Sequence, residues 1–125
     1  MKGKLIIILI LVYNTLLYSQ SDLSVLDNLL EKYEVKYKEI VLSQAVLETG
    51  WFKCKKCSRE LNNPFGFFWK GKYKKFRDLE HSVIYYKIWQ DKWYKGGDYY
   101  VFLKNIGYAE DLEYISKLKT IIKQL

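Results

Sequence analysis

The sequence predicts an α+β domain that is mainly helical and carries one small β-hairpin. Three observations support this fold class: a segment over residues 41–51 that leaves almost no polar face when read as a helix, apolar residues at helical spacing on both sides of it, and one strand signal over residues 65–76. The chain has 125 residues, of which 50% are hydrophobic, so one compact core can form without a metal ion. No repeat, low-complexity tract or second domain is visible, and we expect a monomer.

Residues 1–19 differ from the rest of the chain. Two lysines precede an apolar run over residues 5–12, and the small Ser19 comes before Gln20. This is the layout of a secretory signal peptide, so we expect cleavage near Ser19 or Gln20 and a mature domain over residues 20–125. The alternative is a membrane anchor, but the apolar run is much shorter than the roughly 20 residues that cross a bilayer. We therefore expect an exported protein, in the periplasm, in the cell envelope or outside the cell, with no stable membrane anchor after cleavage.

The net charge of the chain is +7, and removal of residues 1–19 takes away two lysines and no acids, which leaves +5. A basic domain is attracted to anionic partners. For an exported protein the nearest anionic partner is the cell envelope, so we expect the envelope rather than nucleic acid. Solubility alone is the alternative reason for the charge.

Two helices are expected first. Ser24 is placed to cap an amphipathic helix, and a tight corner over residues 35–38 leads into a second helix. The residues that recur at helical spacing, and are therefore expected inward, are Leu26, Leu29, Leu30, Tyr33 and Tyr37. The second helix has almost no polar face, which indicates burial, and it ends before Gly50. Glu48 lies on its last turn, where a carboxyl group is costly unless it is used.

Residues 51–64 have no periodicity and indicate a loop rich in aromatic and polar groups. The loop contains Cys54 and Cys57 in a Cys-Lys-Lys-Cys stretch. Outside the cytosol such a pair favours a local disulfide. The alternatives are a free or intermolecular pair and a zinc site, but zinc would need two further ligands and His81 is the only histidine. We predict no metal and no cofactor.

A hairpin is expected next. Aromatic strand formers over residues 65–70 and 73–76 flank Gly71 and Lys72, which predicts a two-residue turn with glycine first. The exposed aromatic side chains either pack on one another or offer a stacking surface for sugar rings. The sequence is consistent with both interpretations.

Three more helices are expected after the hairpin. Asp78 is placed to cap the first of them, with Glu80 in its first turn and two glycines, residues 96–97, after its end. Its inward positions are expected to be Ile84, Tyr85, Ile88, Trp89 and Trp93. Asp98 begins a short helix that ends before Gly107. The last helix is expected to direct inward Leu112, Ile115, Leu118, Ile121, Ile122 and Leu125.

The residue inventory limits the chemistry. With His81 alone, the chain lacks the several histidines of a typical zinc amidase, and a serine or cysteine nucleophile would have to use that one base. Carboxylate groups are then the remaining candidates for catalysis. Cleavage of a glycosidic bond needs an acid that is protonated near neutral pH, and apolar surroundings raise a carboxyl pKa. Glu48, in a buried helix and followed by Trp51 and Phe52, meets that requirement; the alternative is a helix-end acid bonded to loop amides.

A second carboxylate would act as a base or stabilise an oxocarbenium-like transition state. Glu80 and Asp78 are the candidates at the exit of the hairpin, although capping and the helix dipole favour acids there in any case. Aromatic residues would supply stacking platforms for sugar rings. These are Trp51, Phe65, Trp69, Tyr85 and Tyr108.

Several ordered motifs resemble one family. They are residues 45–51, Ala-Val-Leu-Glu-Thr-Gly-Trp; residues 62–66, Asn-Asn-Pro-Phe-Gly; residues 76–85; and residues 107–111, Gly-Tyr-Ala-Glu-Asp, followed by Tyr114 and Leu118. Together, over about residues 24–123, they are similar to the glucosaminidase family, glycoside hydrolase family 73. Pro64 and Glu110 stand where that family usually has leucine and threonine, and the Cys-Lys-Lys-Cys loop is not a general family feature.

The resemblance implies a lysozyme-like fold and cleavage of peptidoglycan glycan strands after N-acetylglucosamine. It implies that Glu48 is the general acid and that Tyr108 belongs to the active site. Glu80 matches, by its position before the following helix, the carboxylate proposed as the second catalytic group. Asn63 and Phe65 match residues that line the cleft. The resemblance is compatible both with inversion and with assistance by the acetamido group of the substrate.

Two other functions fit the same residues. A muramidase or a lytic transglycosylase also uses a lone glutamate on a lysozyme-like fold, and cleaves the other glycosidic bond. A non-catalytic wall-binding module would use only the basic surface and the exposed aromatic residues.

Overall fold

The computed structural model describes residues 22–54 and 57–125, so the expected signal peptide lies outside the described residues. The helices are residues 22–32, α2 (Lys38–Thr49), α3 (Leu79–Trp93), α4 (Tyr99–Asn105) and α5 (Tyr114–Ile122), with a 3-10 helix η1 (Ser58–Leu61) and strands β1 (Phe68–Trp69) and β2 (Lys72–Tyr73). This confirms the mainly helical α+β class with one small hairpin. Within the described ranges, none of the helices combines the length and the hydrophobicity that a membrane crossing requires.

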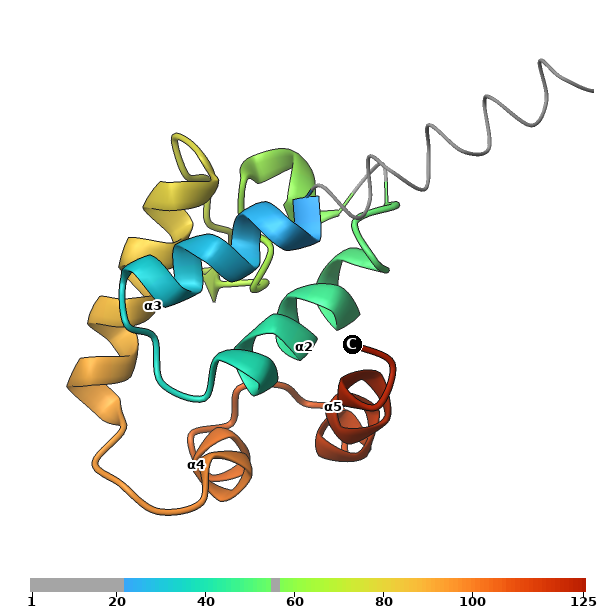
Figure 1. Ribbon diagram of the computed structural model, residues 1–125. Coiled ribbons are helices and arrows are strands. Elements are labelled where there is room, and N and C mark those ends of the chain that lie inside the picture. The colour runs from blue at the N-terminus through green and yellow to red at the C-terminus, as the bar shows by residue number, and fades with distance from the viewer. Residues whose placement is uncertain (1–21, 55–56) are drawn as a thin grey trace, which may run out of the picture.

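Helix α2 lies in the middle of the domain, with the first helix on one side and α5 on the other (Figure 1). The expected burial of α2 is confirmed, since Val41 and Ala45 have no exposed surface. Leu30 of the first helix and Leu118 of α5 are equally buried. Full burial of such a side chain stabilises a fold by roughly 1.5–3 kcal/mol. The core therefore fixes α2, and with it the position of Glu48.

The chain leaves α2 through three consecutive residues in the left-handed region. Gly50 has a φ of 54°, and Trp51 and Phe52 follow with φ of 60° and 61°. Two hydrogen bonds stabilise this exit: Trp51 N–H donates to the Val46 carbonyl at 2.9 Å, and Phe52 N–H donates to Thr49 Oγ1 at 3.0 Å. Helix α2 thus ends sharply after the turn that carries the predicted acid, and the two hydrogen bonds fix the path of the chain there.

The prediction for the inward face of α3 is only partly correct, since Trp89 does pack against the core. Two of its members are mostly exposed, namely Ile88 (63%) and Trp93 (51%). The buried face instead carries Tyr86 and Gln90. The Tyr86 hydroxyl donates to Gln44 Oε1 of α2 at 2.5 Å and lies 2.6 Å from the Tyr99 hydroxyl, which accepts from Gln90 Nε2 at 3.0 Å. Satisfied polar groups can occupy a core, so a count of apolar residues pointed to the wrong face.

The hairpin is present, but its turn is one residue earlier than predicted. Phe68 lies opposite Tyr73 in the antiparallel pair, so Lys70 and Gly71 form the turn, rather than Gly71 and Lys72. Both turn residues have positive φ, 50° and 78°. This is the type I′ pattern, in which glycine is favoured at the second central position, and not the glycine-first type II′ turn.

Asn63 holds the base of the hairpin together. Its side chain is fully buried. Its Nδ2 atom donates to the carbonyls of Phe67 at 2.8 Å and Lys74 at 3.0 Å, and its Oδ1 atom accepts from Phe67 N–H at 2.9 Å. One side chain therefore joins the chain entering β1 to the chain leaving β2.

Helix boundaries agree with the sequence at some positions and not at others. Asp78 and Asp98 cap α3 and α4 as predicted, each accepting from backbone N–H groups of the first turn. Ser24 is not a cap, because it lies inside the first helix. Leu112 does not point inward: it is completely exposed in the loop before α5, and Leu125 is 44% exposed after the end of that helix.

Candidate active site

Glu48, the hairpin and the segment after α4 form a groove of about 860 Å³. Its lining residues are Glu48, Gly66, Phe67, Phe68, Trp69, Tyr73, Trp89, Ile106, Gly107, Tyr108, Ala109 and Glu110. This volume is in the range of sites that bind small molecules and sugar units. The structure thus brings together three of the residues that the sequence singled out, namely Glu48, Trp69 and Tyr108.

Glu48 lies partly buried in the groove wall. Burial raises the pKa of its carboxyl group above the ordinary value, because desolvation disfavours the ionised form. Among the residues that the structure describes, none makes a hydrogen bond or an ion pair with this carboxyl group. Over residues 22–54 and 57–125, therefore, no loop amide is bonded to Glu48, as the alternative of a helix-end acid would require. A raised pKa and an unpaired carboxyl group suit a proton donor.

Tyr108 lies beside Glu48 and is held by a hydrogen bond and by ring packing. Its hydroxyl donates to the Phe65 carbonyl at 2.6 Å, and its ring stacks on Tyr114 with 5.9 Å between centroids. Burial, followed by the nearby Tyr114 and Glu48, raises the pKa of the Tyr108 phenol well above its usual value. The phenol therefore stays protonated, and its ring forms a rigid part of the groove wall.

Three aromatic residues of the hairpin extend the groove into solvent. Phe68, Trp69 and Tyr73 are 60%, 67% and 47% exposed. Phe68 and Tyr73 contact each other edge to face, with 5.3 Å between ring centroids. A group of exposed rings on one wall of a groove is typical of a binding surface rather than of a core.

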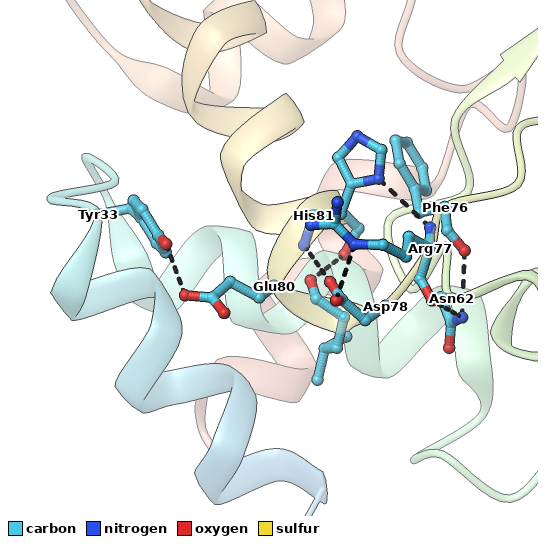
Figure 2. Close-up of polar contacts among 9 residues, drawn as sticks. Tyr33, Asn62, Phe76, Arg77, Asp78, Glu80 and His81 are labelled. Carbon is cyan, nitrogen blue, oxygen red and sulfur yellow. Dashed lines mark hydrogen bonds and ion pairs between the residues drawn. The ribbon is translucent and has the colours of Figure 1, made fainter.

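The structure does not bring Glu80 or Asp78 to this groove. The Glu80 carboxylate accepts a hydrogen bond from the Tyr33 hydroxyl at 2.5 Å (Figure 2). It also accepts from Lys32 Nζ at 2.7 Å, so it joins α3 to the end of the first helix. These bonds, that from Lys32 foremost, lower the pKa of Glu80. Asp78 caps α3 by accepting from His81 N–H at 2.7 Å. Both acids are occupied by contacts that support the fold.

Four of the residues predicted to bind substrate do not line the groove. Asn63 and Phe65 are fully buried, Asn63 beneath the hairpin and Phe65 against the Tyr86 ring at 4.8 Å. Trp51 packs partly buried against the core. The Tyr85 hydroxyl accepts from Lys74 Nζ at 3.0 Å. None of these four side chains is part of the surface of the groove.

Cys54 and Cys57 are joined by a disulfide bond, with 6.0 Å between their Cα atoms. The bond closes a short loop between the end of α2 and η1. Neither residue lines the groove, and neither offers a thiolate for nucleophilic chemistry.

Sequence reasoning missed several groove residues. Trp89 was assigned to the core face of α3, and Phe68 and Tyr73 were not singled out from the other hairpin aromatics. Glu110 is the second carboxylate among the lining residues, and its one signal in the sequence was the departure from the family pattern at that position. Gly66 carried no chemical signal, yet it forms the wall beside Glu48.

Comparison with known proteins agrees with this geometry. No curated protein and no solved structure is similar enough to this chain to count as a match. One family model does match, over residues 24–125, and it is described as mannosyl-glycoprotein endo-β-N-acetylglucosaminidase. The matched range includes the whole groove, and the resemblance carried by the motifs is confirmed. The chain therefore belongs to the Glucosaminidase family, and is a glycoside hydrolase of the endo-β-N-acetylglucosaminidase type.

Proposed function

We propose that this chain is an exported hydrolase that cleaves peptidoglycan after N-acetylglucosamine, with Glu48 as the proton donor. The observation that carries this proposal is the Glu48 carboxyl group: it is partly buried, has a raised pKa, and lies unpaired among the described residues in a groove with exposed aromatic rings. Protonated Glu48 gives its proton to the glycosidic oxygen as the bond to the anomeric carbon breaks. Water then supplies the new hydroxyl group on that carbon, and the proton that the water releases restores the protonated enzyme.

The groove geometry favours Glu110 over Glu80 as the second carboxylate. Glu110 lines the groove, whereas Glu80 is bonded to Lys32 and Tyr33 at the first helix. In this proposal the Glu110 side chain faces the positive charge that develops on the sugar ring when Glu48 donates its proton. Tyr108 makes the adjoining part of the groove wall rigid, since its hydroxyl is bound to the Phe65 carbonyl.

Three features support peptidoglycan as the substrate. The apolar run over residues 5–12 has the layout of an export signal, the mature chain keeps a net charge of +5, and the groove is open and partly aromatic. The family description names a mannosyl-glycoprotein, whose glycan core also contains N-acetylglucosamine in β-1,4 linkage. Both substrates therefore contain a β-1,4 bond after N-acetylglucosamine, although the following sugar differs, and the experiment below separates them. We propose that the exported chain acts as a monomer.

The test is analysis of the released fragments. Purified peptidoglycan is digested with the mature chain, the new reducing ends are reduced with borohydride, and the products are identified by mass spectrometry. We expect reduced N-acetylglucosamine at the new ends. Reduced muramic acid would indicate a muramidase, and a 1,6-anhydro end would indicate a lytic transglycosylase.

Two further outcomes would also contradict the proposal. Binding to sedimented wall material without any soluble product would indicate a wall-binding module. Release of glycan from a high-mannose glycoprotein, with no product from peptidoglycan, would indicate that the substrate is a mannosyl-glycoprotein, as in the description of the family. The Glu48→Gln chain, treated in the same way, is the control for contaminating hydrolases.

A further inference from the structure

A second pocket, of about 490 Å³, lies between α4 and α5. It adjoins the groove, because Ala109 and Glu110 line both. The two hollows therefore lie on either side of one short segment. A ligand that branches from a glycan chain in the groove needs to pass only this segment to enter the pocket.

The apolar part of this pocket is exposed to solvent. Val101 of α4 is 52% exposed, and Leu112 in the loop before α5 is completely exposed. Ile106, at the neighbouring edge of the groove, is 37% exposed. Apolar side chains in this position give up ordered water when a small apolar group covers them. The wall of the pocket is thus suited to short aliphatic side chains.

The pocket offers two cations to a ligand, and two of its three acids already have partners. Asp98 caps α4 and Asp111 accepts from Lys117 Nζ at 2.6 Å, while Glu110 lies at the boundary with the groove. Lys104 and Lys119 also line the pocket, and neither forms an ion pair with a carboxylate of the described residues.

The position of Lys119 is fixed by an aromatic neighbour. Its ammonium group lies over the Tyr100 ring at 5.0 Å from the centroid. Contact with a ring face holds the ammonium group without neutralising its charge. The pocket therefore presents the ammonium groups of Lys104 and Lys119 beside an apolar wall, and the Tyr100 ring holds that of Lys119 in place.

We propose that this pocket binds the peptide stem of the peptidoglycan substrate. This inference rests on the proposed function. Stem peptides branch from the muramic sugar next to the scissile bond, and they combine methyl side chains of alanine with free carboxylates. The methyl groups match Val101 and Leu112, and the carboxylates match Lys104 and Lys119. An extended stem of three or four residues spans roughly 10–14 Å, enough to cross from the groove into an adjoining pocket.

The pocket then determines specificity. A glycan strand without stems can occupy the groove alone, whereas a strand with stems gains the contacts of both hollows. Binding energy from this remote part of the substrate can lower KM or raise kcat.

The first experiment compares two substrates. One is glycan with its stems, and the other is the same glycan after an amidase has removed them. Lys119→Glu, which reverses the held charge, is compared with Lys123→Glu, a matched control just after α5 that does not line the pocket. We expect Lys119→Glu to lower kcat/KM on stem-bearing glycan about tenfold, and to leave kcat/KM on stripped glycan within twofold of wild type. Lys123→Glu should change neither.

The second experiment measures binding without turnover. The synthetic peptide L-Ala-γ-D-Glu-L-Lys-D-Ala is titrated into the mature chain, and backbone amide shifts are followed by NMR. We expect shifts around Val101, Leu112 and Lys119, and their loss in Lys119→Glu.

Equal losses on both substrates, or wild-type activity of Lys119→Glu on stem-bearing glycan without peptide-induced shifts, would overturn the inference and leave the proposed function intact. Failure of the wild-type chain to cleave either glycan would overturn the proposed function as well.

Discussion

A β-carbon built on Gly66 would lie 2.6 Å from Oε2 of Glu48, closer than two such atoms can approach. Gly66 also has a φ of 68°, which side chains rarely adopt. The backbone at the start of the hairpin is therefore fitted against the carboxyl group at the end of α2. This approach contributes to the burial of Glu48, and it depends on the absence of a side chain.

Gly66→Ala should consequently affect both stability and activity. The left-handed backbone costs about 1–2 kcal/mol with a side chain present, and the new methyl group must displace the Glu48 carboxyl group. We expect a lower urea midpoint and a loss of at least tenfold in kcat. Gly97→Ala is the matched control, because its φ is also positive, at 88°, but nothing lies within 4 Å of the added methyl group. Equal kcat in the two variants would contradict the proposed fit.

The two candidate second carboxylates can be separated by isosteric substitution. We expect Glu110→Gln to lower kcat by about 10- to 100-fold, because the neutral amide no longer stabilises positive charge in the groove. Glu80→Gln should leave kcat within twofold, since it alters only contacts to Lys32 and Tyr33. Steady-state kinetics on purified peptidoglycan checks both. Loss of activity in Glu80→Gln with Glu110→Gln unaffected would restore the assignment made from the sequence.

Asn63→Ala should loosen the hairpin. The substitution removes three hydrogen bonds in a fully buried position and leaves the carbonyls of Phe67 and Lys74 without this donor. We expect a loss of about 3 kcal/mol in the free energy of unfolding, measured by urea denaturation. An unchanged unfolding midpoint would show that the base of the hairpin is held by other contacts.

Glu48 should make stability depend on pH. Its folded pKa is raised by burial, so the native state binds this proton more tightly than the unfolded state does. The stabilising effect of the bound proton is complete below the ordinary glutamate range near pH 4, and it is lost as the pH rises through the folded pKa. Glu48→Gln, which cannot ionise, should therefore have a higher thermal midpoint than wild type at pH 7 and an equal one at pH 3. A lower midpoint at pH 7 would contradict the stated cause of the shift.

The sequence predicted best those parts of the fold that depend on local rules. The burial of α2 followed from a segment with almost no polar face, and the caps Asp78 and Asp98 followed from residue type and position. The predictions failed where tertiary contacts decide. Tyr86 and Gln90 are inward because each finds a hydrogen-bond partner across the core, and the sequence of α3 alone does not contain those partners.

The candidate site was predictable only where local patterns or family motifs point to a residue. Glu48, Trp69 and Tyr108 were identified from apolar context, from aromatic clustering and from the family motifs, and they do line one groove. The left-handed backbone at Trp51 is not predicted by its residue type, and Trp51 is not among the residues that line the groove. The place of Glu110 depends on how the segment after α4 packs beside the hairpin, which no local pattern specifies.

The central claim is that Glu48 donates the proton, and one variant tests it most directly. The rate of release of reduced N-acetylglucosamine ends from purified peptidoglycan is measured for wild type and for Glu48→Gln, after circular dichroism has shown that both are folded. We predict a rate that is about 10²- to 10⁴-fold lower in the variant, because the amide keeps the shape but cannot supply the proton. A folded Glu48→Gln chain that releases the same ends at the wild-type rate would contradict the account.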